Sequence, residues 1–309
     1  MLKMCSVLVI GDNCFDITVK GSLSLKEDRN FIPESFHTTP AGTGINFAVA
    51  FARVGGVVKY ITPISKDSFG TEIRRFLSKE NVPFAEFKTN KRTAIIIAFV
   101  GDEGKRTTFA LIKDSAYTDI KFETFKKYFS KEKDLISGVY ISGGILTEHY
   151  VQEELLKVVD FVRKSNIKVF FDPQIRIGME IPDFIRTSNE IAKLSDVVLG
   201  NKEELKYIDL PKDSLIVEKQ GKNGALIIKN RKEMYRVFGI KVNAVDTTGA
   251  GDVFNAAFLY AYLKNTALAK ALELANLAAA FSVTKLGTYF PTISEIRKFA
   301  LSNGISTIF

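Results

Sequence analysis

DTTGAGD, residues 246–252, is followed at once by an apolar run at helical spacing. The apolar positions of this run are Val253, Phe254, Ala256, Ala257, Phe258, Tyr260 and Ala261. The pattern predicts a glycine-rich turn that opens a buried helix. Glycine and alanine leave backbone N–H groups unshielded at the positive end of the helix dipole, so a polyanion can approach the main chain closely there.

Asp252 ends this turn and falls in the first turn of the predicted helix. We expect its carboxylate to stay ionised easily, because nearby N–H donors and the helix dipole favour the charged form. A phosphate held by amides beside a carboxylate that accepts a hydroxyl proton is the chemistry of phosphoryl transfer to an alcohol. The structural alternative is a glycine-rich turn that only packs a helix against a strand.

The same residues resemble a known family. The D-T-x-G-A-G-D pattern is similar to the C-terminal signature of the ribokinase-like (PfkB-type) carbohydrate kinases. The resemblance implies that Asp252 is the catalytic base, that the amides of Gly249, Ala250 and Gly251 form an anion hole, and that Thr248 belongs to the nucleotide site. It also implies a three-layer α/β/α core with a mainly parallel sheet and a small β-sheet lid.

The bulk composition is that of a globular protein. At 309 residues we predict a single α/β domain over residues 1–309. The net charge of +8 comes from lysines and arginines interleaved with acidic residues, which predicts a solvated basic surface and neither a nucleic-acid nor a membrane partner. No signal-peptide pattern and no apolar run of membrane-spanning length is present, so we expect a cytoplasmic protein.

Cysteine and histidine are too sparse for a structural framework. Cys5 and Cys14 lie on or beside the first predicted strand, so they cannot join distant segments. His37 and His149 are isolated and no zinc-type spacing occurs. We therefore expect no transition-metal site.

The first strand leads to two carboxylates. Ser6–Ile10 is a short apolar run ended by Gly11, which is typical of a central strand buried on both faces. We predict that Asp12 and Asp16, which follow it, bind substrate, because open α/β sheets place ligands at the carboxyl ends of strands. Exposed turn carboxylates are the alternative. The resemblance implies a sugar-binding role for Asp16, whereas Cys14 stands where ribokinases proper have Asn, which disfavours ribose.

A second glycine motif spans residues 40–46, Pro-Ala-Gly-Thr-Gly-Ile-Asn, and precedes a predicted helix. It resembles P-G-G-x-G-x-N, a hinge between core and lid whose Asn binds substrate hydroxyls. The resemblance implies that Gly42 and Asn46 bind substrate. Ala41 replaces the first glycine, which predicts a stiffer hinge.

Two later runs predict a β-hairpin, Thr93–Val100 and Arg106–Ile112, with a turn at Gly101–Gly104. The resemblance implies that this hairpin joins the segment before Pro40 in a lid of about residues 17–41 and 84–115. It also implies that the lid can form a homodimer interface. A surface hairpin without a catalytic part is the alternative.

Strands and helices then alternate, which predicts a mainly parallel sheet with right-handed crossovers. The predicted strands are Gly138–Ile141, Lys168–Phe171 and Asp196–Leu199, with helices near 150–165 and 183–193.

The segment after these strands resembles the nucleotide side of the family. Asn201 and Glu204 match N-x-x-E, which implies Mg²⁺ organised near the phosphates, with Glu204 acting through water. A helix N-terminus stabilised by acidic residues is the alternative. The resemblance further implies an ATP site lined by Lys219, Gly221, Gly224 and Asn276. Whether a monovalent cation binds near Asp246, as in some relatives, stays open.

The substrate is left open between several classes. Asp172-Pro173-Gln174-x-Arg176 resembles D-P-N-x-R, in which keto-sugar-acid kinases use the Arg on a substrate carboxylate, and Lys113 lies near a second basic position of those enzymes. Gly144 lies where ribokinases have a substrate-binding Glu, which again disfavours ribose.

We therefore predict an ATP- and Mg²⁺-dependent kinase for a hydroxyl of a monosaccharide, polyol, cyclitol or keto-sugar acid. A nucleoside kinase of the same superfamily and a non-catalytic sugar- or nucleotide-binding relative are the alternatives. The chain has neither G-x-x-x-x-G-K-[ST] nor, after the first strand, G-x-G-x-x-G, which argues against a Walker-type NTPase and an NAD dehydrogenase.

Overall fold

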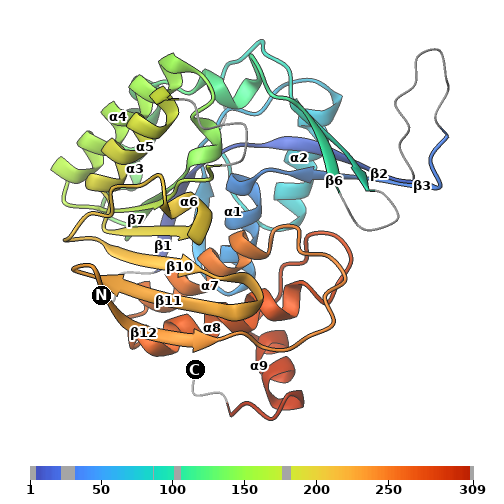
Figure 1. Cartoon of the computed structure of the whole chain (residues 1–309). Coiled ribbons are helices and arrows are strands. Elements are labelled where there is room, and N and C mark those ends of the chain that lie inside the picture. Colours follow the sequence, from blue (N-terminus) through green and yellow to red (C-terminus); the bar gives the residue numbers. More distant parts are fainter. Residues whose placement is uncertain (1–4, 22–31, 86, 101–105, 176–181, 307–309) are drawn as a thin grey trace.

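A computed structural model describes residues 5–21, 32–85, 87–100, 106–175 and 182–306. Within these residues the chain forms an eight-stranded sheet and a separate four-stranded sheet (Figure 1). The large sheet has the order β12-β11-β10-β9-β8-β7-β1-β4. Its strands are β1 (Ser6–Ile10), β4 (Val57–Tyr60), β7 (Gly138–Ser142), β8 (Lys168–Asp172), β9 (Val197–Asn201), β10 (Leu215–Lys219), β11 (Gly224–Lys229) and β12 (Lys232–Phe238).

The large sheet is parallel from β4 through β1, β7, β8 and β9 to β10, and β11 and β12 add an antiparallel edge. This arrangement confirms the mainly parallel sheet expected from the strand–helix alternation. β1 illustrates why a central strand of a parallel sheet is apolar along its whole length. Val7 and Val9 pack into the core on one face of the sheet, whereas Leu8 and Ile10 pack into the core on the other.

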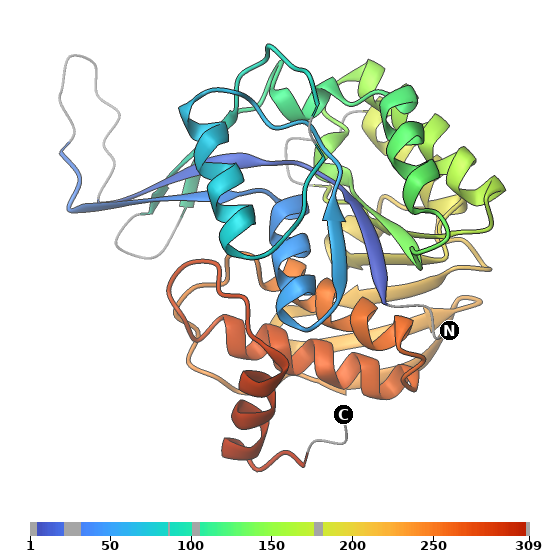
Figure 2. The ribbon, with the colours of Figure 1, turned by 180° about the vertical axis from the view of Figure 1, so that it is seen from behind.

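Helices cover both faces of the large sheet, as the two opposite views in Figures 1 and 2 show. One layer contains α3 (Phe122–Glu132), α4 (His149–Lys164), α5 (Pro182–Lys193) and the short α6 (Lys202–Leu205). The other contains α1 (Thr43–Arg53), α2 (Ser68–Lys79), α7 (Ala250–Leu263), α8 (Leu268–Ser282) and α9 (Ile293–Ser302). The result is the predicted three-layer α/β/α core.

The sequence analysis did not identify α3 or α9. For α9 a signal was present, since Thr292 and Glu295 form a capping box in which each side chain accepts a hydrogen bond from the other residue's backbone N–H. The helices that were predicted agree with the structure to within a few residues. Among the described residues, none of the helices combines the length and apolar content that crossing a membrane requires.

The small sheet has the order β3-β2-β5-β6 and projects to the right of the layered core in Figure 1. Its strands are β2 (Cys14–Lys20), β3 (Ser35–Ala41), β5 (Ala94–Val100) and β6 (Arg106–Leu111). β5 and β6 are antiparallel, which confirms the predicted hairpin, although its turn at 101–104 lies outside the described residues. Because β2 begins directly after Gly11–Asn13, the small sheet starts at the carboxyl end of β1.

The second glycine motif packs against the end of β1, where the small sheet begins. Gly42 has φ 115°, and an added Cβ would lie 2.5 Å from the carbonyl oxygen of Asp12. A Cβ on Gly44 would lie 2.7 Å from the Cα of Gly11. The start of α1 can therefore rest on the end of β1 only because these positions lack side chains. The carboxyl ends of β1, β7, β8 and β10 and the first turns of α1 and α7 converge on this side of the core.

Candidate active site

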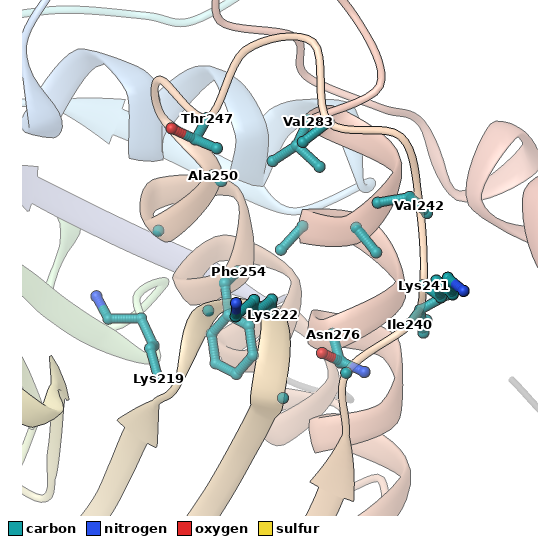
Figure 3. A pocket seen from close by; sticks show the side chains of 17 residues that line it. Lys219, Lys222, Ile240, Lys241, Val242, Thr247, Ala250, Phe254, Asn276 and Val283 are labelled. Carbon is teal, nitrogen blue, oxygen red and sulfur yellow. The ribbon is translucent and has the colours of Figure 1, made fainter. Parts of the chain in front are cut away.

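Two cavities meet at the N-terminus of α7. The first, the α8 cavity, has a volume of about 580 Å³ and lies between the β10–β11 turn, the segment 239–244, α7 and α8 (Figure 3). The second, the small-sheet cavity, has a volume of about 540 Å³ and lies between the end of β1, the small sheet and α7. One helix terminus therefore faces two neighbouring binding spaces.

The turn before α7 is held in place from both sides. Gly249 is left-handed at φ 74°, and an added Cβ would lie 2.3 Å from Cγ2 of Thr288, so only glycine fits there. The Asp246 carboxylate accepts hydrogen bonds from the amides of Thr248 at 2.9 Å and Gly287 at 3.1 Å. Asp246 thus fastens the turn to the segment after α8.

This turn separates the two cavities. Ala250 and Gly251 line the α8 cavity, whereas Thr248 and Gly249 line the small-sheet cavity. Thr248, predicted for the nucleotide site, therefore lines a different cavity from the residues predicted for the ATP site, which are Lys219, Gly221, Gly224 and Asn276. The first N–H groups of a helix have no partner within the helix, so this boundary is where an anion would find free donors.

Asp252 lies in the first turn of α7 and is only 4% exposed, facing the small-sheet cavity. Its Oδ2 accepts a hydrogen bond from Nδ2 of Asn46 at 2.9 Å. Burial raises the pKa of Asp252 to about 8, although the Asn46 hydrogen bond and the charge of Lys219 lower it. The expectation that this carboxylate ionises easily is wrong, because loss of hydration outweighs the favourable donors.

The remaining predicted substrate residues also line the small-sheet cavity. Asp12, Asp16, Gly42 and Asn46 all contribute to its wall. Asp12 is held by the backbone amide of Thr43, 3.1 Å from its Oδ2.

Neighbouring residues set the positions of both carboxylates. The Ser142 hydroxyl donates to Oδ1 of Asp12 at 3.2 Å, and the Cys14 thiol donates to Oδ1 of Asp16 at 3.5 Å. Gly144 leaves room for Asp12, since an added Cβ would lie 2.8 Å from Asp12 Oδ1. Asp12 therefore fills the space that a side chain at position 144 would need.

Asn201 and Glu204 lie outside the walls of both cavities. They form a capping box at the start of α6, in which Glu204 Oε2 accepts from the Asn201 amide at 2.7 Å and Asn201 Oδ1 accepts from the Glu204 amide at 3.0 Å. This arrangement agrees with the alternative given above, a helix N-terminus stabilised by acidic residues. No group of three or more metal-ligating side chains occurs in the described part of the chain. A hydrated Mg²⁺ needs few direct carboxylates, so the buried Glu204 still fits an indirect role.

The α8 cavity contains the other predicted nucleotide residues. Lys219, Gly221, Gly224 and Asn276 line it, and Figure 3 shows Lys219 and Asn276 on opposite sides with Phe254 between them. Asn276 Nδ2 donates to the carbonyl oxygen of Phe238 at 2.9 Å.

Sequence reasoning missed several walls of this cavity. Phe254 could have been found, because two residues along a helix place it on roughly the opposite side of α7 from Asp252. The segment 239–244 carries no motif. The sequence analysis also gave no role to Asp172, which is fully buried and forms an ion pair with Lys219 at 3.1 Å. The predicted Arg176 lies outside the described residues, and Lys113 is exposed and absent from the cavity walls.

A helix N-terminus between two cavities, with a buried carboxylate beside it, is suited to the transfer of an anionic group between two bound molecules. The chain belongs to the pfkB family of carbohydrate kinases, whose family model matches residues 4–295. It is therefore a phosphotransferase that acts on a sugar hydroxyl.

Relatives match over most of their length. A Pyrococcus horikoshii protein described as a sugar kinase is 30% identical over 301 residues, 94% of each chain. The ribokinase of Lactococcus lactis is 25% identical over 309 residues, 95% of this chain and 96% of the ribokinase. A 5-dehydro-2-deoxygluconokinase of Clostridium beijerinckii is 26% identical over 284 residues, 84% of this chain and 83% of that enzyme.

Solved structures show the same ribokinase-like fold. A structure described as a ribokinase II from E. coli superposes with a TM-score of 0.84 at 21% identity, and covers 97% of this chain and 100% of that one. The P. horikoshii sugar kinase in complex with ATP superposes with a TM-score of 0.79 at 28% identity, and covers 95% of this chain and 97% of that one.

Proposed function

We propose that this enzyme transfers the γ-phosphoryl group of ATP, with Mg²⁺, to a hydroxyl of an uncharged monosaccharide or polyol. The observation that carries the proposal is the boundary at Gly249, where the α7 terminus separates two cavities and Asp252 faces only one of them. The ATP complex of the P. horikoshii sugar kinase supports ATP as the donor. The E. coli ribokinase II structure, which holds ATP and Mg²⁺, has the same fold.

In the proposed reaction Asp252 accepts the proton of the substrate hydroxyl. Asn46 holds the carboxylate through its hydrogen bond to Oδ2, so the other oxygen can face the substrate. The amides of Gly249–Gly251 lie at the boundary and stabilise negative charge on the transferring phosphoryl group. ATP in the α8 cavity and the substrate in the small-sheet cavity would then react across the α7 terminus.

The other predicted residues take supporting roles in the proposal. Asp12, Asp16, Gly42 and Asn46 bind substrate hydroxyls. The nucleotide is held by Lys219, Gly221, Gly224 and Asn276, with Thr248 at the boundary. Asn201 and Glu204 organise the hydration shell of Mg²⁺, which would neutralise phosphate charge. The small sheet acts as the lid that excludes water during transfer, over about residues 17–41 and 84–115 of a single 1–309 domain.

Charge favours a neutral substrate over a sugar acid. Among the described residues that line the small-sheet cavity, the charged side chains are Asp12, Asp16 and Asp252. Ile112 lines the cavity, whereas the adjacent Lys113 is exposed. A substrate carboxylate would therefore face the carboxylates of Asp12 and Asp16 among the described residues, and burial strengthens such repulsion.

A panel of acceptors tests this proposal. ADP release with Mg²⁺-ATP is measured for neutral sugars and polyols, for the matching sugar acids, and for nucleosides. We expect turnover with a neutral compound and at least ~10-fold lower kcat/KM for its acid counterpart. ADP release that no acceptor stimulates would count against a kinase, and a preference for acids would reject the neutral substrate class.

The small sheet also supports the proposed homodimer. Phe36, Phe109 and Leu111 are exposed at 71%, 43% and 57% and lie on the same face of this sheet by register. Light scattering should give twice the mass of one chain for the wild type, and the mass of a single chain for Phe109→Glu. Replacing K⁺ by a bulky organic cation in the activity assay addresses the separate, open question of whether a monovalent cation binds near Asp246.

A further inference from the structure

A buried carboxylate lies between the two cavities without a role in the mechanism above. Asp172 is the last residue of β8 and has no exposed surface. Its Oδ2 accepts hydrogen bonds from Gln174 Nε2 at 2.8 Å, Lys219 Nζ at 3.1 Å, Tyr140 Oη at 3.4 Å and Asn255 Nδ2. Its Oδ1 is equally buried and accepts none from the described residues. The donors therefore converge on one fixed oxygen atom.

The partners of Asp172 reach both halves of the site. Gln174 lines the small-sheet cavity, and Lys219 lines the α8 cavity. Asn255 lies in α7, three residues after Asp252. Asp172 thus contacts α7, which carries Asp252, and β10, which carries Lys219.

The local backbone supports a specific function. Gln174 has φ 53°, a left-handed conformation that residues other than glycine rarely adopt, and its side chain is buried. Such conformations persist where the surroundings determine them, commonly at ligand sites. The turn after β8 is therefore held in a geometry that directs the Gln174 amide to Asp172.

The ammonium of Lys219 lies next to the proposed anion hole. An added Cβ on Gly251 would have Lys219 Nζ as its near neighbour, at 3.6 Å. In Figure 3 Lys219 lies on the opposite side of the cavity from Asn276. Gly251 lines the α8 cavity, two residues after Gly249, which lines the small-sheet cavity where the acceptor would bind. The ammonium therefore lies at the end of the α8 cavity where the γ-phosphate of a bound ATP would meet the acceptor.

The ion pair keeps this lysine charged despite its burial. Burial lowers the pKa of Lys219, but the charges of Asp172, Glu204 and Asp252 outweigh that effect, so the pKa is raised. A buried lysine without a carboxylate would tend to lose its proton. Asp172 therefore maintains a cation in the wall of the α8 cavity.

We propose that Asp172 is a positioning residue, which holds the ammonium of Lys219 beside Gly251 so that it contacts the γ-phosphate of ATP. The inference rests on the proposed function, because it takes the α8 cavity as the ATP site. An ion pair that only stabilises the core is the competing explanation. The two explanations predict different nucleotide affinities. If Asp172 positions Lys219, loss of either residue weakens binding of ATP more than binding of ADP, whereas a purely structural ion pair does not distinguish the two nucleotides.

Calorimetric titration with Mg²⁺-ATP and with Mg²⁺-ADP tests the inference without knowledge of the acceptor. The proteins are the wild type, Lys219→Met, Asp172→Asn, the double variant and Asp196→Asn. The last is the control for loss of an ion pair outside both cavities, because it breaks the more exposed pair Arg163–Asp196 at 2.7 Å. We expect each site variant to lose ~10-fold or more in ATP affinity and at most ~3-fold in ADP affinity. The control should change neither.

The double variant separates positioning from independent effects. If Asp172 acts through Lys219, the double variant should lose no more ATP affinity than Lys219→Met alone. Equal losses for ATP and ADP would show a structural role, and additive losses would show that Asp172 acts independently of Lys219. Either result would reject the inference. Should Asp172→Asn not fold, an unchanged ATP-to-ADP affinity ratio in Lys219→Met is sufficient to reject it. Absence of nucleotide binding by the wild type would instead refute the proposed function itself.

Discussion

The two cavities that meet at Gly249 have similar volumes, about 540 and 580 Å³, but different walls. The small-sheet cavity presents the side chains of Asp12, Asp16 and Asp252, which come from segments far apart in the sequence. The α8 cavity presents glycines, alanines and aliphatic side chains, with Lys219, Lys222 and Lys241 among them. One wall thus offers carboxylates to hydroxyl donors, and the other offers backbone, aliphatic surface and positive charge.

This difference indicates where selectivity resides. A wall of backbone and small side chains suits a nucleotide, whose phosphates bind to amides and whose base needs apolar contact. Carboxylates at fixed positions discriminate by the placement of hydroxyl groups and by charge. We therefore expect changes in the small-sheet cavity to affect the acceptor, and changes in the α8 cavity to affect ATP.

The largest expected effect is that of Asp252→Asn. The substitution keeps the shape and the Asn46 contact but removes the proton acceptor, so kcat should fall ~1000-fold. ATP affinity should stay within ~3-fold, because Asp252 faces the other cavity. Steady-state kinetics measures kcat and calorimetry measures ATP affinity. A comparable loss in both would contradict the assignment of Asp252 to the small-sheet cavity alone.

A pair of glycine variants tests the boundary itself. Gly249→Ala places a Cβ 2.3 Å from Thr288 at φ 74°, so we expect a loss of ~2 kcal/mol in the free energy of unfolding and at least ~100-fold in kcat. Gly251→Ala is the control for stability, since only Lys219 Nζ, at 3.6 Å, lies near its added Cβ. Urea unfolding of both variants should separate them. Equal stability would mean that the turn is less constrained than the structure shows.

The pH dependence sharpens the distinction next. With the pKa of Asp252 near 8, the carboxyl is largely protonated at neutral pH in the free enzyme, so kcat/KM should rise ~10-fold per pH unit below about 8 and level off above it. A pH–rate profile with saturating ATP measures this limb. A plateau already reached at pH 6 would contradict the raised pKa.

The same group affects stability. The native pKa of about 8 exceeds the ordinary value of 3.8, so the folded state holds a proton that the unfolded state releases between these pH values. The wild type should therefore lose stability relative to Asp252→Asn as pH rises from about 4 to about 8. Thermal unfolding at pH 5 and pH 9 should show that the variant's stability relative to the wild type is greater at pH 9 than at pH 5.

A smaller effect is expected from Gly144→Ala. Its Cβ would lie 2.8 Å from Oδ1 of Asp12 and displace that carboxylate, so the KM for the acceptor should rise ~10-fold. The KM for ATP should not change, because Gly144 lines only the small-sheet cavity. A rise in both constants would show that the cavities are not independent.

The smallest effect should come from Asn276→Ala in the α8 cavity. The Asn276 amide contacts the Phe238 carbonyl at 2.9 Å, and its loss should raise the KM for ATP ~3- to 10-fold without a change in acceptor KM. Initial rates at varied ATP and fixed acceptor measure it. A larger effect on the acceptor would place Asn276 in the wrong half of the site.

Sequence alone determined the order of the core elements and most of the residues that line the two cavities. The apolar run of β1 and the DTTGAGD turn before α7 are local patterns, in which hydrophobic period and glycine placement follow from backbone geometry. Such local patterns singled out Asp12, Asp16 and Asp252, whereas Asn46 was found through the family resemblance. All four line one cavity.

The tertiary structure decided what depends on contacts between distant residues. Asp252 has a pKa near 8 because the fold buries it, which the favourable local donors gave no reason to expect. Thr248 lines the small-sheet cavity, whereas Ala250 and Gly251, on the other side of the left-handed Gly249, line the α8 cavity. The pair of Asp172 and Lys219 joins the ends of β8 and β10, 47 residues apart. Desolvation and long-range pairing are properties of the packed chain, so no local pattern in the sequence records them.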